Sequence, residues 1–370
     1  MLLIDSIEAY HVAMPLKAPF RTAAGEETVI HSLLVKMMGQ GQYGWGEAAV
    51  GALPLYSPEW ASAGFMLIRD VFAPRLVGCP IESGQELQAK LACFKANYFP
   101  KAALDTAWWD LYAKVQSKPL WQVLGATTGT VDVGEVCGVQ GSMDELIARI
   151  AQAVDGGFKR VKIKCLPGWD VEVMRKVCSS FPDKVFHVDC NSGYTLDDTA
   201  TMKQLDELGL AMIEQPLAHD DLVDHATLQQ QLATPICLDE SIVSSEKARK
   251  AAEIGSCKFI NIKLGRTGGI TSAIAIHDIC RNAGIGNWVG GMVESAVGVA
   301  HNLAFAAMPN ITYPSDVFVS RHSYDENLAG PEMVLSGPSQ MTSLAAPGIG
   351  VEPLAKKLQR MTVERATIAA

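Results

Sequence analysis

Five charged residues recur at a nearly constant interval through the middle of the chain, each at the end of a short apolar segment. They are Lys164, Asp189, Glu214, Asp239 and Lys263, and the successive spacings are 25, 25, 25 and 24 residues. One strand–helix unit of a (β/α)₈ barrel takes roughly 25 residues plus insertions, because about 250 residues make eight units. The spacing therefore predicts five consecutive strands that each end with a charged side chain. Such side chains would project into the carboxyl-terminal mouth of the barrel, where barrel active sites lie.

The three acids of this series, Asp189, Glu214 and Asp239, predict a site for a divalent cation. Carboxylates held close together repel one another, which raises their pKa values and destabilises the site unless a cation is bound. A set of oxygen ligands without histidine or cysteine favours Mg²⁺, or Mn²⁺, over zinc. The alternative is that each acid caps a helix or forms a surface ion pair. Three acids in register between two lysines favour the metal site.

Two lysines bracket the acids, Lys164 on the second predicted barrel strand and Lys263 on the sixth. Two amines that face each other across a barrel suit abstraction of a proton from the carbon α to a carboxylate. Lys162 lies two residues before Lys164 on the same strand face, where like charge lowers the pKa of one of the pair. Arg266 could tune Lys263 in the same way. The alternative is a basic rim that binds anions or plays a structural role.

The elements that would position these residues alternate in type after Thr130. Short apolar strands are predicted at 131–139, 160–165, 185–188, 211–213, 236–238, 259–262, 287–289 and 311–313. Ser142 and Glu145 form a capping-box pattern for one of the intervening helices, and Thr195 precedes another. Eight such units indicate an α/β fold, either a (β/α)₈ barrel or a doubly wound sheet. Before residue 125, strands at 3–12 and 29–37 precede a helical pattern over 60–118, which is typical of an α+β domain.

The composition excludes several classes of function. The chain has 370 residues, with 31 Lys and Arg against 40 Asp and Glu, and its net charge of −9 argues against nucleic-acid binding. The first ten residues lack the basic start and apolar run of a signal peptide, and the apolar stretch 289–308 is broken by polar residues, so no membrane segment is predicted. Nine cysteines without a C-x-x-C pair indicate reduced thiols and a cytoplasmic protein.

At these residues the chain resembles the enolase superfamily in its muconate-lactonizing subgroup, and is most similar to the o-succinylbenzoate synthase / N-succinylamino acid racemase family. The resemblance covers nearly the whole chain. The matching segments are Pro19–Thr22, Gly44–Glu47, Ala103–Asp110, Lys162–Lys164, Pro167–Asp170, Asp189–Asn191, Ile213–Pro216, Cys237–Ser241, Lys263–Gly269 and Gly290–Glu294.

The resemblance implies an N-terminal α+β capping domain (1–125), a modified (β/α)₇β TIM-like barrel (126–320) and a C-terminal segment returning to the cap (321–370). That barrel has one helix fewer than the eight units counted above. The resemblance further implies Mg²⁺ on the three acids, Lys164 and Lys263 as acid and base, a small-molecule carboxylate substrate and a homo-oligomer. It also implies that the segment from Phe20 to Gly25 closes over the substrate.

Two reactions are implied, a syn dehydration that yields o-succinylbenzoate in menaquinone biosynthesis and the racemization of N-succinylamino acids. The alternatives are a muconate-type cycloisomerase, a dipeptide epimerase, a Schiff-base aldolase and a non-catalytic barrel. A dipeptide epimerase would typically carry an Asp-x-Asp pattern on the last strands, which the segment 292–295 does not supply.

Several further residues are candidates for supporting roles. Asn191, Gln215 and Glu240 each stand next to or near a predicted metal ligand and are expected to orient it through hydrogen bonds. Glu294 is expected to line the substrate pocket, or to be an ordinary loop residue. The chain departs from the family pattern near Val136, where many members have serine, and over Ser320–His322. These departures concern contacts to the substrate rather than the acids and lysines.

Overall fold

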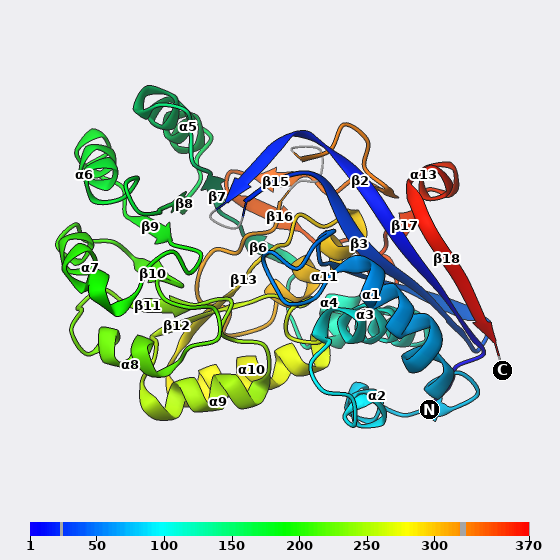
Figure 1. Cartoon of the computed structure of the whole chain (residues 1–370). Helices are drawn as coiled ribbons and strands as arrows, with labels where there is room; N and C mark the ends of the chain where they lie inside the picture. The colour runs from blue at the N-terminus through cyan, green and yellow to red at the C-terminus, as the bar shows by residue number, and fades with distance from the viewer. Residues whose placement is uncertain (23–24, 319–322, 370) are drawn as a thin grey trace.

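The computed structural model describes residues 1–22, 25–318 and 323–369, and the side chains of residues 20–25 lie outside this description. A twisted antiparallel sheet with its helices lies beside a barrel of parallel strands surrounded by helices (Figure 1). The described part of the chain contains no helix that is both long enough and apolar enough to cross a membrane. The predicted α/β class, an α+β cap with a TIM-like barrel, is confirmed.

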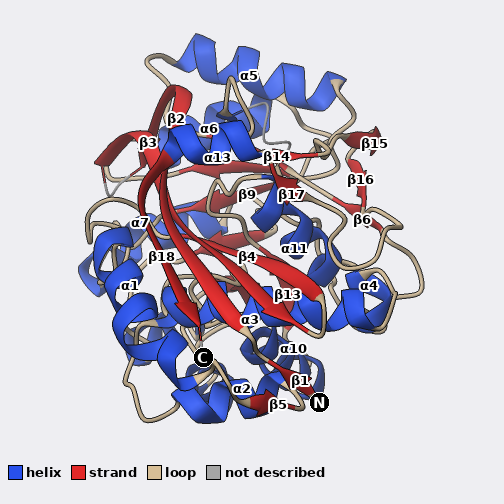
Figure 2. Cartoon of the chain, turned by 90° about the vertical axis from the view of Figure 1, so that its right-hand side faces the viewer, coloured by secondary structure: helices blue, strands red, loops and turns tan. Residues whose placement is uncertain are grey.

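The cap is built on a four-stranded antiparallel sheet in the order β18-β2-β3-β4. Its strands are β2 (Ser6–Thr22), β3 (Gly25–Gly39), β4 (Gln42–Ala49) and β18 (Thr362–Ala369). The last strand of the chain pairs with β2 along its whole length, so the C-terminal segment lies on the cap sheet (Figure 2). The domain limits at 125 and 320 stay a prediction.

Helix α3 (Tyr98–Val115) packs directly against β4 of this sheet. A Cβ at Gly44 or Gly46 would lie 2.2 Å from a carbonyl oxygen of α3, so only glycine permits this close approach. The remaining cap elements are short: β1 (Leu2–Leu3), β5 (Pro80–Ile81), α1 (Ala61–Leu67), a π-helical turn (Ile68–Phe72), a 3₁₀ turn (Ala73–Arg75), α2 (Gly84–Leu91) and α4 (Leu120–Val123).

Seven parallel strands in sequential order form the barrel sheet. They are β7 (Glu135–Cys137), β8 (Val161–Lys164), β9 (Phe186–Asp189), β10 (Met212–Glu214), β11 (Ile236–Leu238), β12 (Phe259–Ile262) and β13 (Gly286–Val289). The helices that follow them are α5 (Met143–Asp155), α6 (Val171–Ser180), α7 (Thr199–Asp206, after a 3₁₀ turn at Leu196–Asp198), α8 (Val223–Gln229), α9 (Ser245–Ile254), α10 (Ile270–Ala283) and α11 (Ala296–Ala306). Caps at Ser142 and Thr195 start α5 and this 3₁₀ turn, as predicted.

Two strand predictions were wrong in detail. The expected strand 131–139 is two strands in different sheets, β6 (Thr130–Asp132) and β7. The expected eighth strand at 311–313 is irregular, because Pro314 has no N–H to donate to a ladder. The barrel is nevertheless closed here, since Thr312 and Asp316 donate backbone hydrogen bonds to the carbonyls of Asn287 and Val289, while Ser315 pairs with the backbone around Val133.

The C-terminal part completes both units with small elements. β15 (Leu335–Gly337) and β16 (Gln340–Thr342) form a three-stranded sheet with β6, and β14 (Ala329–Gly330) pairs with β17 (Glu352–Pro353). Helix α13 (Ala355–Met361) leads directly into β18. The segment after the barrel thus pairs with β6, the strand directly before the first barrel strand β7, and then reaches the cap.

Candidate active site

The strand ends place the charged residues predicted from the spacing next to one another. Lys164, Asp189 and Glu214 are direct partners across β8, β9 and β10, so their side chains lie side by side. Asp239 and Lys263 follow the last residues of β11 and β12, the next two strands of the sheet. All five residues are at most 9% exposed, so their charges are held in a largely dry environment.

Each acid of the series is compensated by a cation. Lys164 Nζ lies 2.7 Å from Asp189 Oδ2, and Lys263 Nζ lies 3.0 Å from Asp239 Oδ2. Arg266 is 2.6 Å from the other oxygen of Asp239. Burial raises the pKa of Asp239, but the charges of Arg266 and Lys263 outweigh it and hold that pKa at about 2. Arg266 and Lys263 therefore share one carboxylate, that of Asp239.

Lys162 is held charged rather than tuned toward a base. Its Nζ lies 3.2 Å from both Asp189 and Glu214, and 2.7 Å from Asp316. Burial lowers the pKa of this amine, but Asp316 and the two other acids raise it well above its ordinary value. Lys162 is therefore not the lysine of the pair whose pKa is depressed, because Asp316 supplies a carboxylate that the spacing did not predict.

Asn191, Gln215 and Glu240 form hydrogen bonds around these acids and lysines. Lys164 Nζ donates to Asn191 Oδ1 at 2.6 Å, and Asn191 donates to Glu240 at 3.0 Å. The side-chain oxygen Oε1 of Gln215 accepts from the backbone N–H of Asp239 at 2.9 Å. Burial, with Asp239 and Asp189 nearby, raises the pKa of Glu240 to about 8. The contacts of these three residues agree with an orienting role.

A tyrosine from the cap reaches the same place. The Tyr56 hydroxyl accepts from Lys263 at 2.8 Å and from Arg266 at 3.0 Å, and it donates to Asp239 at 3.1 Å. Burial and the neighbouring Asp239 raise the pKa of Tyr56 well above its ordinary value, so the hydroxyl keeps its proton. Nothing in the sequence pattern indicated Tyr56, because its position depends on how the cap loop docks on the barrel.

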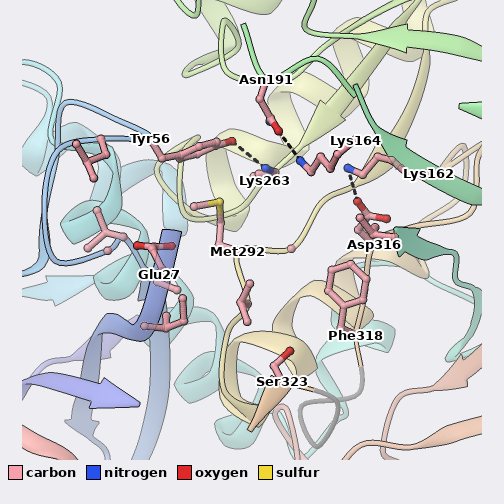
Figure 3. Close-up of a pocket in the computed structure, with 18 of the residues that line it drawn as sticks. Glu27, Tyr56, Lys162, Lys164, Asn191, Lys263, Met292, Asp316, Phe318 and Ser323 are labelled. Carbon is pink, nitrogen blue, oxygen red and sulfur yellow. Dashed lines mark hydrogen bonds and ion pairs between the residues drawn. The ribbon is translucent and has the colours of Figure 1, made fainter. Parts of the chain in front are cut away.

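The side chains border a cavity of about 260 Å³ between cap and barrel (Figure 3). Lys162, Lys164 and Lys263 line its barrel side, and the apolar part of the wall consists of Ile30, Ala49, Val50, Leu53, Leu55, Val136, Met292, Val293 and Phe318. The departure at Val136 therefore does face the cavity. A cavity with an apolar wall and a few convergent charged groups is typical of a small-molecule site.

The structure does not place three of the predicted substrate-contact positions in the cavity wall. Glu294 does not line the cavity; it accepts from the Met292 N–H at 2.8 Å and from Asn302 at 3.0 Å, and so stabilises its own loop. The side chain of Phe20 and the departure at Ser320–His322 lie outside the described residues. The contributions of Phe20 and Ser320–His322 to the site therefore stay predictions.

The chemistry of the buried acids, rather than their present spacing, fits a hard divalent cation. Asp189, Glu214 and Asp239 offer only oxygen ligands from three neighbouring strands, which is the donor set that Mg²⁺ prefers. In the described residues no three acidic, histidine or cysteine side chains converge closely enough to coordinate one ion. Lysine and arginine nitrogens lie against these oxygens instead, at 2.6 to 3.2 Å.

Family models match both units of the chain. Residues 6–125 match the N-terminal domain of the mandelate racemase / muconate lactonizing enzyme family, and residues 145–357 match the enolase C-terminal domain-like family. Together the two matches cover most of the chain. They correspond to the cap and the barrel described above.

Relatives along the full length carry two different names. An o-succinylbenzoate synthase from Geobacillus kaustophilus is 43% identical over 97% of this chain and 96% of its own length. An N-succinylamino acid racemase from Thermus thermophilus is 40% identical over 97% of each chain. The crystal structure of an enolase superfamily member from Listeria innocua superposes with a TM-score of 0.96 at 35% identity, and each chain is covered completely.

Proposed function

This chain belongs to the mandelate racemase / muconate lactonizing enzyme family of the enolase superfamily, and from this we propose that it abstracts the proton α to the carboxylate of a small-molecule substrate. As a family member with these full-length relatives, it is a lyase or isomerase. The single observation that carries the proposal is the pair of buried amines, Lys164 at the end of β8 and Lys263 directly after β12, which line one cavity.

In this proposal the two lysines are the proton carriers. One amine, unprotonated, takes the α-proton on its own face of the substrate carbon, and the other, protonated, stands on the opposite face. In a racemization the second lysine returns a proton to its face. In a syn dehydration the second lysine stays cationic beside the intermediate and stabilises the negative charge there. The first lysine then gives the abstracted proton to the hydroxyl group on its own face, and the carbon–oxygen bond breaks to release water. Hydrogen bonds from Lys164 to Asn191 and from Lys263 to Tyr56 hold the amines in place.

Asp189, Glu214 and Asp239 are the residues that would hold Mg²⁺, or Mn²⁺. When bound, such an ion supplies positive charge that stabilises the negative charge developing on the substrate carboxylate. Gln215 and Glu240 would keep these acids oriented, Gln215 through its bond to the Asp239 N–H and Glu240 through Asn191. The Lys162 ammonium, fixed by Asp316, adds a constant positive charge to the cavity.

The synthase and the racemase reactions both stay in the proposal, because full-length relatives of about 40% identity carry each name. The apolar wall, including Val136 and Met292, suits either a cyclohexadiene ring or an amino acid side chain. The two reactions are separated by comparing turnover of the succinylated cyclohexadiene carboxylate with turnover of a panel of N-succinyl amino acids.

We also propose that the protein is cytoplasmic, that it forms a homo-oligomer, and that its domains divide at residues 125 and 320.

The two-lysine assignment is tested by exchange of the α-proton in D₂O. With an N-succinyl amino acid, Lys164→Ala and Lys263→Ala should each abolish exchange from one stereoisomer and leave exchange from the other measurable by NMR. The control is Lys203→Ala, which removes an exposed lysine of α7 and should exchange both isomers at the wild-type rate. Normal exchange of both isomers in both active-site variants would refute the assignment. Substrate trapped on the protein by borohydride would point to a Schiff-base aldolase instead.

A further inference from the structure

One carboxylate of the cavity wall, that of Glu27 on β3, has no ion pair with any cation among the described residues. The other acids that line the cavity from the barrel are compensated: Glu135 by Arg149 at 2.7 Å, and Asp316 by Lys162 at 2.7 Å. For Glu27, the described residues record neither an ion pair nor a side-chain hydrogen bond. Glu27 therefore differs from Glu135 and Asp316, the lining acids of the barrel, in that no described cation neutralises its charge.

Glu27 lies in a confined position. A Cβ built on Gly51 would lie 3.2 Å from Glu27 Oε1, so the carboxylate is close to the glycine backbone of the neighbouring cap loop. Gly51 has a φ of +88°, a conformation that other residues rarely adopt. In Figure 3 the Glu27 side chain points toward the cavity beside Met292, on the cap side and away from Lys164. The loop thus leaves room for a carboxylate that faces the cavity.

The surroundings of Glu27 make this charge costly when nothing binds to it. The side chain is only partly exposed, and burial raises its pKa above the usual value. A partly desolvated carboxylate without a partner loses hydration that no other interaction replaces. The free energy of the site falls when a cation approaches Glu27. Among the described residues, the lysines and Arg149 that line the same cavity are already paired with other acids. A cationic group of the bound molecule would therefore find in Glu27 a carboxylate that these residues leave unpaired.

We propose that Glu27 is a specificity-determining residue that binds a cationic group, a guanidinium or an ammonium, at the far end of the substrate from the reacting carbon. The inference rests on the proposed function and narrows its substrate class to N-acyl amino acids with a basic side chain. The α-carbon and its carboxylate would lie at the barrel lysines. The aliphatic part of the side chain would lie along Ile30 and Met292, and its charge would reach Glu27.

The test compares N-succinyl-arginine with N-succinyl-citrulline, which has nearly the same shape but no charge. A charge-assisted hydrogen bond in a partly dry site changes kcat/KM on the order of 10- to 100-fold. Wild-type protein should prefer the arginine substrate by about that factor. Glu27→Gln should reduce the ratio of the two kcat/KM values to about 1, by slowing arginine turnover and not citrulline turnover.

The matched control is Glu8→Gln, which removes the same charge from β2 of the same sheet, outside the cavity lining. It should keep the wild-type preference, so an equal loss in both variants would overturn the assignment to Glu27. A wild-type ratio near 1, or a preference that survives in Glu27→Gln, would also overturn it.

Binding of the same two ligands by calorimetry separates this inference from the proposed reaction. If neither ligand is turned over but the arginine ligand binds more tightly in a Glu27-dependent way, the specificity role stands and the reaction falls. If both ligands are racemized at equal rates and bound equally, the reaction stands and the specificity role falls.

Discussion

Asp105 of α3 joins the cap to the barrel, and its substitution by asparagine should change stability with opposite sign at low and high pH. The carboxylate is fully buried, and it accepts from the backbone N–H of Thr271 at 3.0 Å and from Gln88 at 3.0 Å. Thr271 stands in the first turn of α10, directly after the segment that carries Lys263 and Arg266. Burial raises the pKa of Asp105 from 3.8 to about 6, against the opposing hydrogen bonds.

The size of the effect follows from this shift. Two pKa units correspond to about 3 kcal/mol. Because the folded state holds the proton more tightly than the unfolded state, the ionization penalty is absent below the unfolded pKa, grows between about pH 4 and 6, and is constant above. Asp105→Asn removes the penalty but turns an amide nitrogen toward Gln88, which loses one hydrogen bond of about 1 kcal/mol. The variant should be less stable by up to about 1 kcal/mol at pH 4 and more stable by about 2 kcal/mol at pH 8.

The assay is urea unfolding of wild type and variant at pH 4, 6 and 8, followed by tryptophan fluorescence. Trp109 donates to the Thr271 hydroxyl at 2.9 Å, so one of the seven tryptophans that contribute to the signal lies at this contact. The control Asp155→Asn, at an exposed position at the end of α5, should change the free energy of unfolding by less than about 0.5 kcal/mol at each pH. A difference between wild type and Asp105→Asn that does not change with pH would refute the reasoning.

Two further predictions concern the other buried carboxylates. Glu47 accepts from the N–H groups of Ser295 at 3.0 Å and Gly298 at 2.8 Å, so Glu47→Gln should destabilise the fold by about 2 to 3 kcal/mol, and an unchanged thermal midpoint would contradict this. Removal of divalent cations with EDTA should abolish turnover and added Mg²⁺ should restore it. Calorimetry should show Mg²⁺ binding to wild type but not to Glu214→Gln, and full activity after exhaustive EDTA dialysis would refute the metal site.

The barrel could be predicted because its strand–helix units have nearly constant length, so the charged residues at the strand ends reveal the period. The irregular parts could not be predicted in this way. The segment 312–316 closes the barrel through backbone hydrogen bonds to two different neighbours, although Pro314 prevents a regular strand. In the cap, β2 continues ten residues past its predicted end at residue 12, and β3 begins four residues before its predicted start at residue 29, since these parts of the two strands pair with each other.

The candidate site was predictable where its residues come from consecutive strands, and not where they come from elsewhere. Asp189 and Glu214 are neighbours because parallel strands in register end together. Asp316 was missed because it lies on the irregular closing segment, and its role appears only through its contacts with Lys162 and Arg160. For Glu294 the sequence left open a place in the cavity wall or in an ordinary loop, and its carboxylate turns back to the Met292 N–H.

The docking of the cap completes the site, and this links stability to the proposed chemistry. Tyr56 contacts Lys263, Arg266 and Asp239 only if the cap sits correctly on the barrel. Two of the buried cap carboxylates, Asp105 and Glu47, bind the first turns of α10 and α11. Each of these helices follows a barrel segment that borders the cavity. The cap therefore holds the loops that carry the reacting groups, and a substitution that weakens either contact should impair the site before it unfolds the barrel.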